Sequence, residues 1–409
     1  MDLLLLDSGE TVTVTGTDSD DLGIIDEGGV AVENGTIAEV ASSQLLERKY
    51  SASQYIRLDG GLILPGFVDP HTHLVFQGSR ENEFESRLDG ANYLDILQKG
   101  GGIMETVRKT REATEDELFM TAQGRLSIAI ESGTTAIEIK SGYGLTSHQE
   151  LKILKIIAQL KKQNPCHILR TFLGAHAIPS ESTQAEYTKL IVDAMLPIVS
   201  QRKLADFCDV FCEDGAFDKD ASKTILRAGL QGGLRPKIHA DQFTENGGAR
   251  LANDVGAVSA DHLVHSDTLD LKAMKKTSVT PVVLPASSHS LLSSQYAPAK
   301  EMISYGLPVA LGSDFSPSNW VLGPLTVAAI AARALGMKSD ELIRGITLNA
   351  ARALGLQQEI GSLRAGKSAD IVVLKIPNHK WIGYTYGEGV VDKVLIAGKQ
   401  EVDNGRRLK

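Results

Sequence analysis

The sequence predicts an α/β protein in which a (β/α)8 TIM barrel is joined to a small accessory β-sandwich domain built from both chain ends. The middle of the chain alternates apolar segments with amphipathic helical stretches, which is the pattern of strand–helix units. Both ends instead hold short β-branched segments separated by turns. A chain of 409 residues, 42% of them hydrophobic, can bury a sizeable core and is long enough for a large barrel and a second domain.

The two ends of the chain have the same β character. Near the start, "TVTVTGT" alternates β-branched residues, and "GGVAVENGTIAEVA" predicts a hairpin around Asn34-Gly35, a strong turn signal. Near the end, "IGSLRAGKSADIVVLKI" predicts a turn and a strand, and "DKVLIAGKQEVDNG" predicts a second hairpin. We therefore expect residues 1–61 and 351–409 to form the accessory domain, and residues 62–350 to form the barrel.

Eight apolar segments in the middle of the chain predict the barrel strands. Helical stretches such as "SHQELKILKIIAQLKKQ" separate them. Eight parallel strands with crossover helices close into a barrel; a doubly wound sheet is the alternative, disfavoured because no Gly-rich phosphate fingerprint follows the first strand. The predicted strands are Leu62–Pro70, Thr134–Ser141, Ile168–His176, Ala205–Glu213, Pro236–Asp241, Val258–Val264, Thr280–Pro285 and Pro308–Asp314.

Composition excludes several classes of protein. A net charge of −9 and a sequence pI of about 5.6 argue against a nucleic-acid surface, which needs a basic stripe. Three cysteines in so long a chain indicate a reduced protein without a disulfide framework. The start "MDLLLLDSGE" lacks the features of a signal peptide, and no segment has the apolar length of a membrane span. We expect a cytoplasmic protein whose partner is a small molecule, with neither nucleic acid nor membrane involved.

Polar side chains gather at the C-terminal ends of the predicted strands, where the active sites of such barrels lie. Lys140, Tyr143, Gln242 and Asp314 lie at or just beyond these ends. Five of the ten histidines also fall there, a clustering that chance does not readily produce. These five are His71, His73, His176, His239 and His262.

The stretch "GFVDPHTHL", residues 66–74, places two histidines at the end of the first predicted strand. Residues i and i+2 of a strand point to the same face, so His71 and His73 face one point. Two neutral imidazoles aimed at one point suit a borderline transition metal, although H-x-H alone is a weak signal. With His239 and Asp314 the set becomes three nitrogens and one oxygen, with a position left open for water. The sequence therefore predicts a metal centre.

The remaining histidines differ in what their surroundings predict. His148 opens a helix as part of a "TSHQE" cap, and His167 and His379 lie in polar segments, so we expect all three to be solvated. His265 is predicted to lie outside the site, and His289, which follows the seventh strand, could line it or lie beside it.

Several motifs are similar to those of the amidohydrolase superfamily, whose members hydrolyse amide-like bonds in a metal-bearing barrel with an accessory β-domain. They are "LPGFVDPHTH", "KIHAD", the terminal-strand "GSD" and "GSLRAGKSADIVVL". Within that superfamily the chain resembles the imidazolonepropionase family over about residues 60–265. The similar stretches include "FQGSRENEFE", "IEIKSGYGL", "RTFLGAHAIP", "DVFCEDGAF", "IHADQFTENGGARLA" and "SADHL". The first two are much more specific than H-x-H.

The resemblance implies a reaction, in which 4-imidazolone-5-propanoate and water give N-formimidoyl-L-glutamate. It implies one Zn²⁺ or Fe ion per chain, bound by the four side chains already named. A single ion is expected because the fourth strand, "DFCDVFCED", lacks the lysine that bridges two ions in other amidohydrolases. Asp314 would hold the attacking water and take its proton, and His262 would orient that water or stabilise developing charge.

The resemblance also implies a substrate pocket. Arg80 would pair with the substrate propionate, a task that suits a planar guanidinium, although an ion pair within "SRENEFE" is the alternative. Tyr143 and His176 would donate or accept hydrogen bonds, and Gln242 would contact the reacting ring. Ser316 and Ser318 stand where the family usually has asparagine and glycine, so a related cyclic amide or imidazolone-like ring is an alternative substrate.

Two further classes remain to be weighed. Deaminases of the superfamily carry a glutamate three residues after the fifth-strand histidine, where this chain has Gln242, and an amide cannot shuttle protons as an acid does. A scaffold protein that has lost catalysis is expected to lack at least one metal ligand, and this chain lacks none. The family resemblance also implies a homodimer.

Overall fold

The computed structural model describes residues 1–16, 21–90, 101–387 and 389–408. Its largest sheet has eight strands in the order β15-β14-β13-β12-β11-β10-β9-β8, all parallel to their neighbours. This confirms the predicted barrel. The barrel strands are β8 (Phe67–Asp69), β9 (Thr134–Lys140), β10 (His167–Ala175), β11 (Phe207–Cys212), β12 (Arg235–Ala240), β13 (Ser259–His262), β14 (Thr280–Val283) and β15 (Ala310–Leu311).

The barrel closes just beyond its two edge strands, β8 and β15. An isolated parallel bridge joins Thr72 to Phe315. Its hydrogen bonds run from the Asp314 amide to the His71 carbonyl at 3.0 Å and from the His73 amide to the Phe315 carbonyl at 2.9 Å. The residues that close the barrel are therefore neighbours of, or identical with, the predicted metal ligands.

Helices cover the outside of the barrel, and their apolar faces pack on the strands. In α5 (Glu115–Glu131) a capping box of Thr114 and Glu117 fixes the start, and residues at helical spacing, such as Leu118, Ala122 and Leu126, are buried. The other helices are α2 (Glu81–Leu88), α4 (Ile103–Glu112), α6 (Ser147–Gln163), α7 (Gln184–Leu190), the π-helix η1 (Ile191–Met195), α8 (Leu196–Gln201), α9 (Lys219–Gln231), α10 (Gly248–Val255), α11 (Thr268–Thr277), α12 (Pro285–Ser290), α13 (Ala299–Ser304), α14 (Pro324–Leu335), α15 (Ser339–Gly345) and α16 (Leu348–Ala353).

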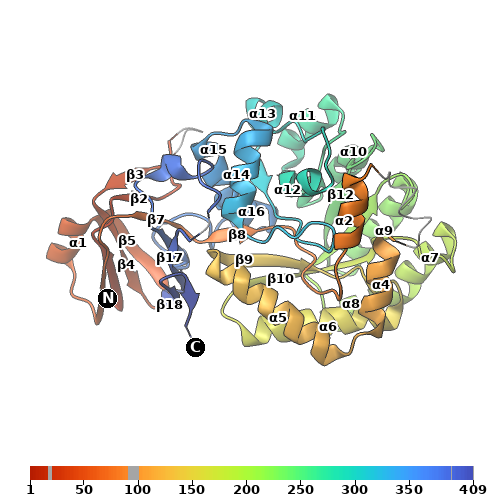
Figure 1. Cartoon of the computed structure of the whole chain (residues 1–409), viewed down its shortest axis with the longest axis horizontal. Helices are drawn as coiled ribbons and strands as arrows, with labels where there is room; N and C mark the ends of the chain where they lie inside the picture. The colour runs from red at the N-terminus through yellow and green to blue at the C-terminus, as the bar shows by residue number, and fades with distance from the viewer. Residues whose placement is uncertain (17–20, 91–100, 388, 409) are drawn as a thin grey trace.

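Both chain ends combine beside the barrel, as predicted; Figure 1 shows the red N-terminal and blue C-terminal strands side by side. Two sheets form there, in the orders β5-β4-β1-β6 and β19-β18-β17-β16-β7-β2-β3. The hairpin at Asn34-Gly35 joins β4 to β5, and both turn residues have positive φ, 52° and 74°. The elements are β1 (Leu3–Leu6), β2 (Glu10–Val12), β3 (Ile24–Asp26), β4 (Gly28–Glu33), β5 (Thr36–Ser42), α1 (Ser43–Lys49), β6 (Gln54–Arg57), β7 (Leu62–Pro65), β16 (Ile371–Leu374), the 3₁₀ helix η2 (His379–Trp381), β17 (Val391–Ile396), β18 (Lys399–Asp403) and β19 (Arg406–Arg407).

The single strand predicted over Leu62–Pro70 is wrong, because the segment divides between two sheets. β7 pairs with β16 and β2 in the seven-stranded sheet, whereas β8 pairs with β9 in the barrel. Gly66 lies between them, and its amide donates to the Asp370 carbonyl at 2.8 Å. A continuous apolar run gives no signal of this change of sheet. The domain boundaries at 61/62 and 350/351 stay a prediction.

Two histidines expected to be solvated are instead paired with carboxylates. His167, at the start of β10, lies with Nε2 3.0 Å from Asp370 Oδ2, and it joins the barrel to the end sheets. His379 lies with Nδ1 2.9 Å from Glu10 Oε2. Their partners are distant in sequence, so the polar local sequence could not reveal these contacts.

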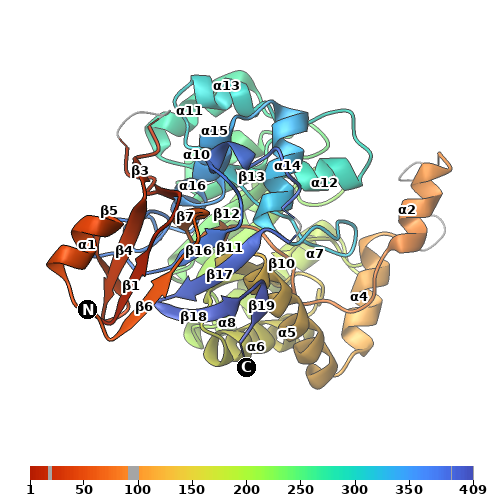
Figure 2. The same cartoon turned by 60° about the vertical axis from the view of Figure 1, so that its left-hand side comes forward.

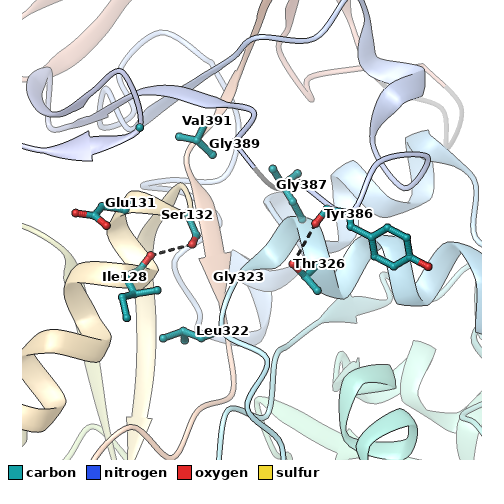
Figure 3. A pocket seen from close by; sticks show the side chains of 12 residues that line it. Ile128, Glu131, Ser132, Leu322, Gly323, Thr326, Tyr386, Gly387, Gly389 and Val391 are labelled. Carbon is teal, nitrogen blue, oxygen red and sulfur yellow. Dashed lines mark hydrogen bonds between the residues drawn. The ribbon is translucent and has the colours of Figure 1, made fainter.

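A cavity of about 470 Å³ lies at the seam between the barrel helices and the C-terminal strands. Figure 3 shows one wall formed by Ile128 of α5 and by Ser132, the residue that follows this helix, and the start of α14 facing the segment around Tyr386. Thr326 Oγ1 donates to the Tyr386 carbonyl at 3.1 Å across this seam. No side chain of the histidine cluster lines this cavity. Among the described helices, none has the length and apolar character needed to traverse a bilayer.

We expect Gly66→Ala to destabilise the protein by about 1–3 kcal/mol, as overpacking does. A Cβ at this position would lie 2.2 Å from Thr135 Oγ1, so the crossing between the two sheets would have to move. Gly124→Ala is the matched control, because a Cβ there meets nothing within 4 Å and the residue lies inside α5. The control should gain about 0.5–1 kcal/mol. Urea unfolding measures both, and equal midpoints for the two variants would contradict the expectation.

Candidate metal centre and active site

Three histidines and an aspartate converge at the C-terminal end of the barrel. His71 Nε2 and His73 Nε2 lie 3.6 Å and 3.5 Å from Asp314 Oδ1. His239 Nε2 lies 3.5 Å from His73 Nε2. All four side chains are buried. The structure thus brings together the four side chains predicted as metal ligands, which come from the segment after β8, from β12 and from the segment after β15.

The backbone has an unusual conformation at three strand ends around the site, one of them at the ligand Asp314. Asp241, His262 and Asp314 have φ of 51°, 77° and 52°, in the left-handed region that non-glycine residues rarely occupy. Such conformations cost free energy and persist only where the surrounding structure fixes them. Asn319 fixes one of them, because its Nδ2 donates to the carbonyls of Ser313 and Asp314 at 2.8 Å and 3.1 Å.

A carboxylate holds the rear nitrogen of two of the histidines. His71 Nδ1 lies 2.6 Å from Asp261 Oδ2, and His239 Nδ1 lies 3.1 Å from Asp209 Oδ2. A carboxylate accepts a hydrogen bond, so each imidazole carries its proton on Nδ1. The lone pair on Nε2 is then left facing the cluster, which is the tautomer that a metal ligand requires.

Burial keeps two imidazoles of the cluster neutral, those of His71 and His73. It lowers the pKa of His71 and of His73 well below the ordinary value, and neighbouring cationic groups lower both further. Burial also raises the pKa of Asp314 to about 6, against a hydrogen bond from Ser287 that lowers it. Near neutral pH these two side chains therefore offer uncharged nitrogens beside the carboxylate of Asp314.

These residues fit a divalent metal ion. His71 Nε2 is buried and has no hydrogen-bond partner among the described residues, although it faces the cluster. The ligand atoms of His71, His73 and Asp314 all lie within 4.8 Å of one another, and so do those of His71, His239 and His262. Nitrogen-rich sets with one carboxylate oxygen suit zinc and similar ions.

His262, Tyr143 and His176 surround the cluster. The His262 ring centroid lies 5.3 Å from that of His239, and His176 stacks on His73 at 4.9 Å. The Tyr143 ring lies 5.7 Å from that of His73. Burial raises the pKa of the Tyr143 hydroxyl, so it stays protonated and able to donate.

Arg80 precedes α2 and lies beside the Tyr143 hydroxyl. Its Nη1 is 3.9 Å from Glu83 Oε2, so the ion pair within "SRENEFE" is present but long. Its Nε is buried without a hydrogen-bond partner among the described residues. The guanidinium therefore keeps a donor for a further acceptor.

The remaining predicted pocket residues lie in the loops after the strands. Gln242 is half-buried in the turn after β12, where Glu213 Oε2 accepts from the Phe243 amide at 2.8 Å. Ser316 is buried, and its Oγ lies 3.3 Å from that of the half-buried Ser318. Of the histidines outside the cluster, His148 and His289 are exposed and His265 is half-buried.

The sequence reasoning missed the residues that hold this site in place. Besides Asp209 and Asp261, Glu150 accepts hydrogen bonds from the amides of Gly142, Gly144 and Leu145, which fixes the loop bearing Tyr143. An acid inside an otherwise apolar strand, as in "DFCDVFC", was the one available signal. Glu150 lies in an amphipathic helix, and its sequence surroundings gave no signal of this role.

Known proteins were compared with the chain and its fold. The model of the Amidohydrolase family matches residues 232–400. Imidazolonepropionase from Alkaliphilus metalliredigens (strain QYMF) is 40% identical over 99% of both chains. Imidazolonepropionase from Geobacillus kaustophilus (strain HTA426) is 43% identical over 94% of this chain and 92% of its own.

Solved structures agree with the fold. A zinc-bound adenosine deaminase from Xanthomonas campestris aligns with a TM-score of 0.77 at 19% identity, over 100% of this chain and 94% of its own. Atrazine chlorohydrolase from Arthrobacter aurescens TC1, complexed with zinc, aligns at 0.71 and 15% identity, over 99% and 96%. Identities this low show a shared fold alone.

A barrel of this construction with the matching family model makes the chain a hydrolase of the amidohydrolase class. Relatives that are 40% identical over nearly the whole length of the chain narrow this class to one family. The chain belongs to the imidazolonepropionase family.

We expect the zinc affinity of the metal-free protein to fall about tenfold for each pH unit below 6, because one proton must leave before the metal binds. That proton is on Asp314, whose pKa burial raises to about 6. His71 and His73, whose pKa values are lowered, add no such dependence there. Competition titrations against a chromophoric chelator between pH 5 and 8 measure the effect. Asp314→Asn should bind zinc more weakly, and its zinc affinity should not fall in this way below pH 6. If the affinity of the variant still falls below pH 6, the proton does not belong to Asp314.

Proposed function

We propose that this chain opens the ring of 4-imidazolone-5-propanoate with water to give N-formimidoyl-L-glutamate, a step in histidine degradation. His71, His73, His239 and Asp314 hold one zinc or iron ion per chain. The observation that carries the proposal is this buried set of three imidazoles and one carboxylate, in a chain whose relatives are imidazolonepropionases. The enzyme acts in the cytoplasm, as a homodimer.

The proton transfers are assigned to two side chains. A divalent ion held by these residues would supply Lewis acidity, which would bring the pKa of a water molecule towards neutrality. Asp314 accepts the proton that the water loses, because its carboxylate is the acidic side chain that lies among the three imidazoles. The oxygen bonds to the ring carbonyl carbon, the C–N bond breaks, and Asp314 returns the proton to the leaving nitrogen. His262 orients the water or stabilises charge on the carbonyl oxygen.

Substrate recognition is assigned to the side of the cluster next to His73. Arg80 pairs with the substrate propionate, because a guanidinium presents parallel donors that match a carboxylate. Tyr143 and His176 hydrogen-bond the substrate, and both contact His73 through their rings. Gln242, Ser316 and Ser318 contact the substrate ring from the loops after β12 and β15. Gln242 cannot transfer a proton as an acid would, which favours hydrolysis over deamination.

The first experiment is turnover of freshly generated 4-imidazolone-5-propanoate, followed by loss of its ultraviolet absorbance, with metal analysis of the same sample. We expect turnover with about one ion per chain, as three protein nitrogens and one oxygen bind a single ion. Chelation and His239→Ala should abolish both metal binding and turnover. His148→Ala removes an exposed imidazole and should change neither. A fully metallated protein that leaves this compound untouched would move the substrate to a related cyclic amide.

Arg80→Met should raise KM for the same substrate by about 10- to 100-fold and change kcat little, since charge-assisted hydrogen bonds contribute about 1.5–3 kcal/mol. The reason is that the guanidinium contacts the propionate and not the reacting carbonyl. Arg108→Met is the matched control, because Arg108 is exposed on α4 and pairs with Glu105 and Glu112. Steady-state kinetics of both variants measure the effect, and an unchanged KM in Arg80→Met would remove Arg80 from the pocket.

A further inference from the structure

Five charged side chains lie buried in one layer next to the histidine cluster. The acids are Glu138, Asp209 and Asp261, and the bases are Lys140 and Lys237. Each of the five has 0% side-chain exposure. Charges taken out of water are costly unless they are paired. The ion pairs between the lysines and the acids of this layer therefore fix the position of each carboxylate.

Lys140 contacts the two carboxylates that hold the histidines. Its Nζ lies 2.7 Å from Asp209 Oδ2 and 3.8 Å from Asp261 Oδ2. These are the same oxygens that face the imidazoles, Asp209 Oδ2 toward His239 and Asp261 Oδ2 toward His71. One ammonium group thus touches both of the acids behind the cluster.

Lys237 makes a different set of contacts. Its Nζ donates a hydrogen bond to the Pro70 carbonyl at 3.0 Å and lies 3.7 Å from Asp261 Oδ2 and 4.0 Å from Glu138 Oε1. Asp209 is not among these partners. Within the part of the chain that the structure describes, Lys140 is the lysine that joins Asp209 to Asp261. The layer therefore holds two buried lysines, of which one links the supports of two histidines.

We infer that Lys140 is a positioning residue of the metal centre, which fixes His239 by holding Asp209 in place. Without the ammonium the Asp209 carboxylate repels Glu138 and Asp261, and the His239 imidazole loses the acceptor that sets its orientation and tautomer. The inference rests on the proposed function in that it takes His239 as a metal ligand. Lys140 touches neither metal nor substrate in this role.

The direction in which zinc affinity changes in one variant distinguishes this positioning role from a purely electrostatic effect of the lysine. Lys140→Met keeps the length of the side chain and removes its charge. A positioning role predicts that zinc binds about 10- to 100-fold more weakly, the usual loss when such a support is removed. A purely electrostatic role predicts tighter binding, because a cation near the site has been removed. Lys237→Met removes the same charge from the same layer without touching Asp209, and we expect it to bind zinc as tightly as the unmodified protein or more tightly.

The experiment is a competition titration of zinc against a chromophoric chelator on the metal-free full chains, with their folding checked by circular dichroism. The absorption spectrum of the cobalt-substituted proteins gives a second readout, which should change in Lys140→Met and not in Lys237→Met. Zinc binding by Lys140→Met that equals or exceeds that of the unmodified protein would overturn the inference.

A second variant covers the case in which Lys140→Met does not fold. Lys140→Met with Glu138→Gln removes one charge of each sign and keeps the net charge of the layer. Positioning by Lys140 predicts weak zinc binding in this double variant too. Zinc affinity restored to that of the unmodified protein would show that only the net charge of the layer matters, and would overturn the inference. Failure of the proposed function is distinguishable, because an unmodified protein that binds zinc without turning over 4-imidazolone-5-propanoate leaves these titrations unaffected.

Discussion

The closing of the barrel is the constraint on which the rest of the molecule depends. β8 and β15 lie at opposite edges of the eight-stranded order, and the segments just after them are joined by two hydrogen bonds, which involve His71, His73, Asp314 and Phe315. Asp69 adds to this junction, since its Oδ1 accepts from the Ser313 amide at 3.0 Å. The same contacts that close the cylinder therefore bring an imidazole pair and a carboxylate together from opposite ends of the barrel sequence.

Burying so polar a centre requires compensation around it. His71 and His73 are kept neutral by burial, carboxylates support His71 and His239, and buried lysines pair with those carboxylates. Arg125 supports the segment that leads out of the site, since its Nη1 donates to the Leu74 and Phe76 carbonyls at 2.8 Å and its guanidinium lies 3.6 Å from the Phe76 ring centroid. Rigidity of the site thus comes from groups that the chemistry does not use.

The sequence could predict what depends on local pattern. Alternating apolar segments predicted the barrel, Asn34-Gly35 predicted a hairpin, and the motifs around His71 and His239 pointed to the family; the structure and the comparisons confirm all three. What it could not predict depends on contacts between distant segments. The change of sheet at Gly66, the pair of His167 with Asp370 and the carboxylate behind each of two histidines all join residues far apart in the chain. The roles of the predicted site residues stay predictions, although the fold gathers them.

The change of sheet at Gly66 has a consequence for the order in which the chain is completed during synthesis. β7 leaves the ribosome early, yet one of its two partners, β16, is formed by residues 371–374, near the end of the chain. Until those residues emerge, the apolar segment Leu62–Pro65 has one side of its backbone unpaired, next to the strand that leads to His71. A nascent chain therefore presents an open, apolar strand edge through most of translation, which is the kind of surface that chaperones cover and that aggregation exploits. Completion of the end sheets, last in time, protects β7, the strand that leads into the first strand of the catalytic barrel.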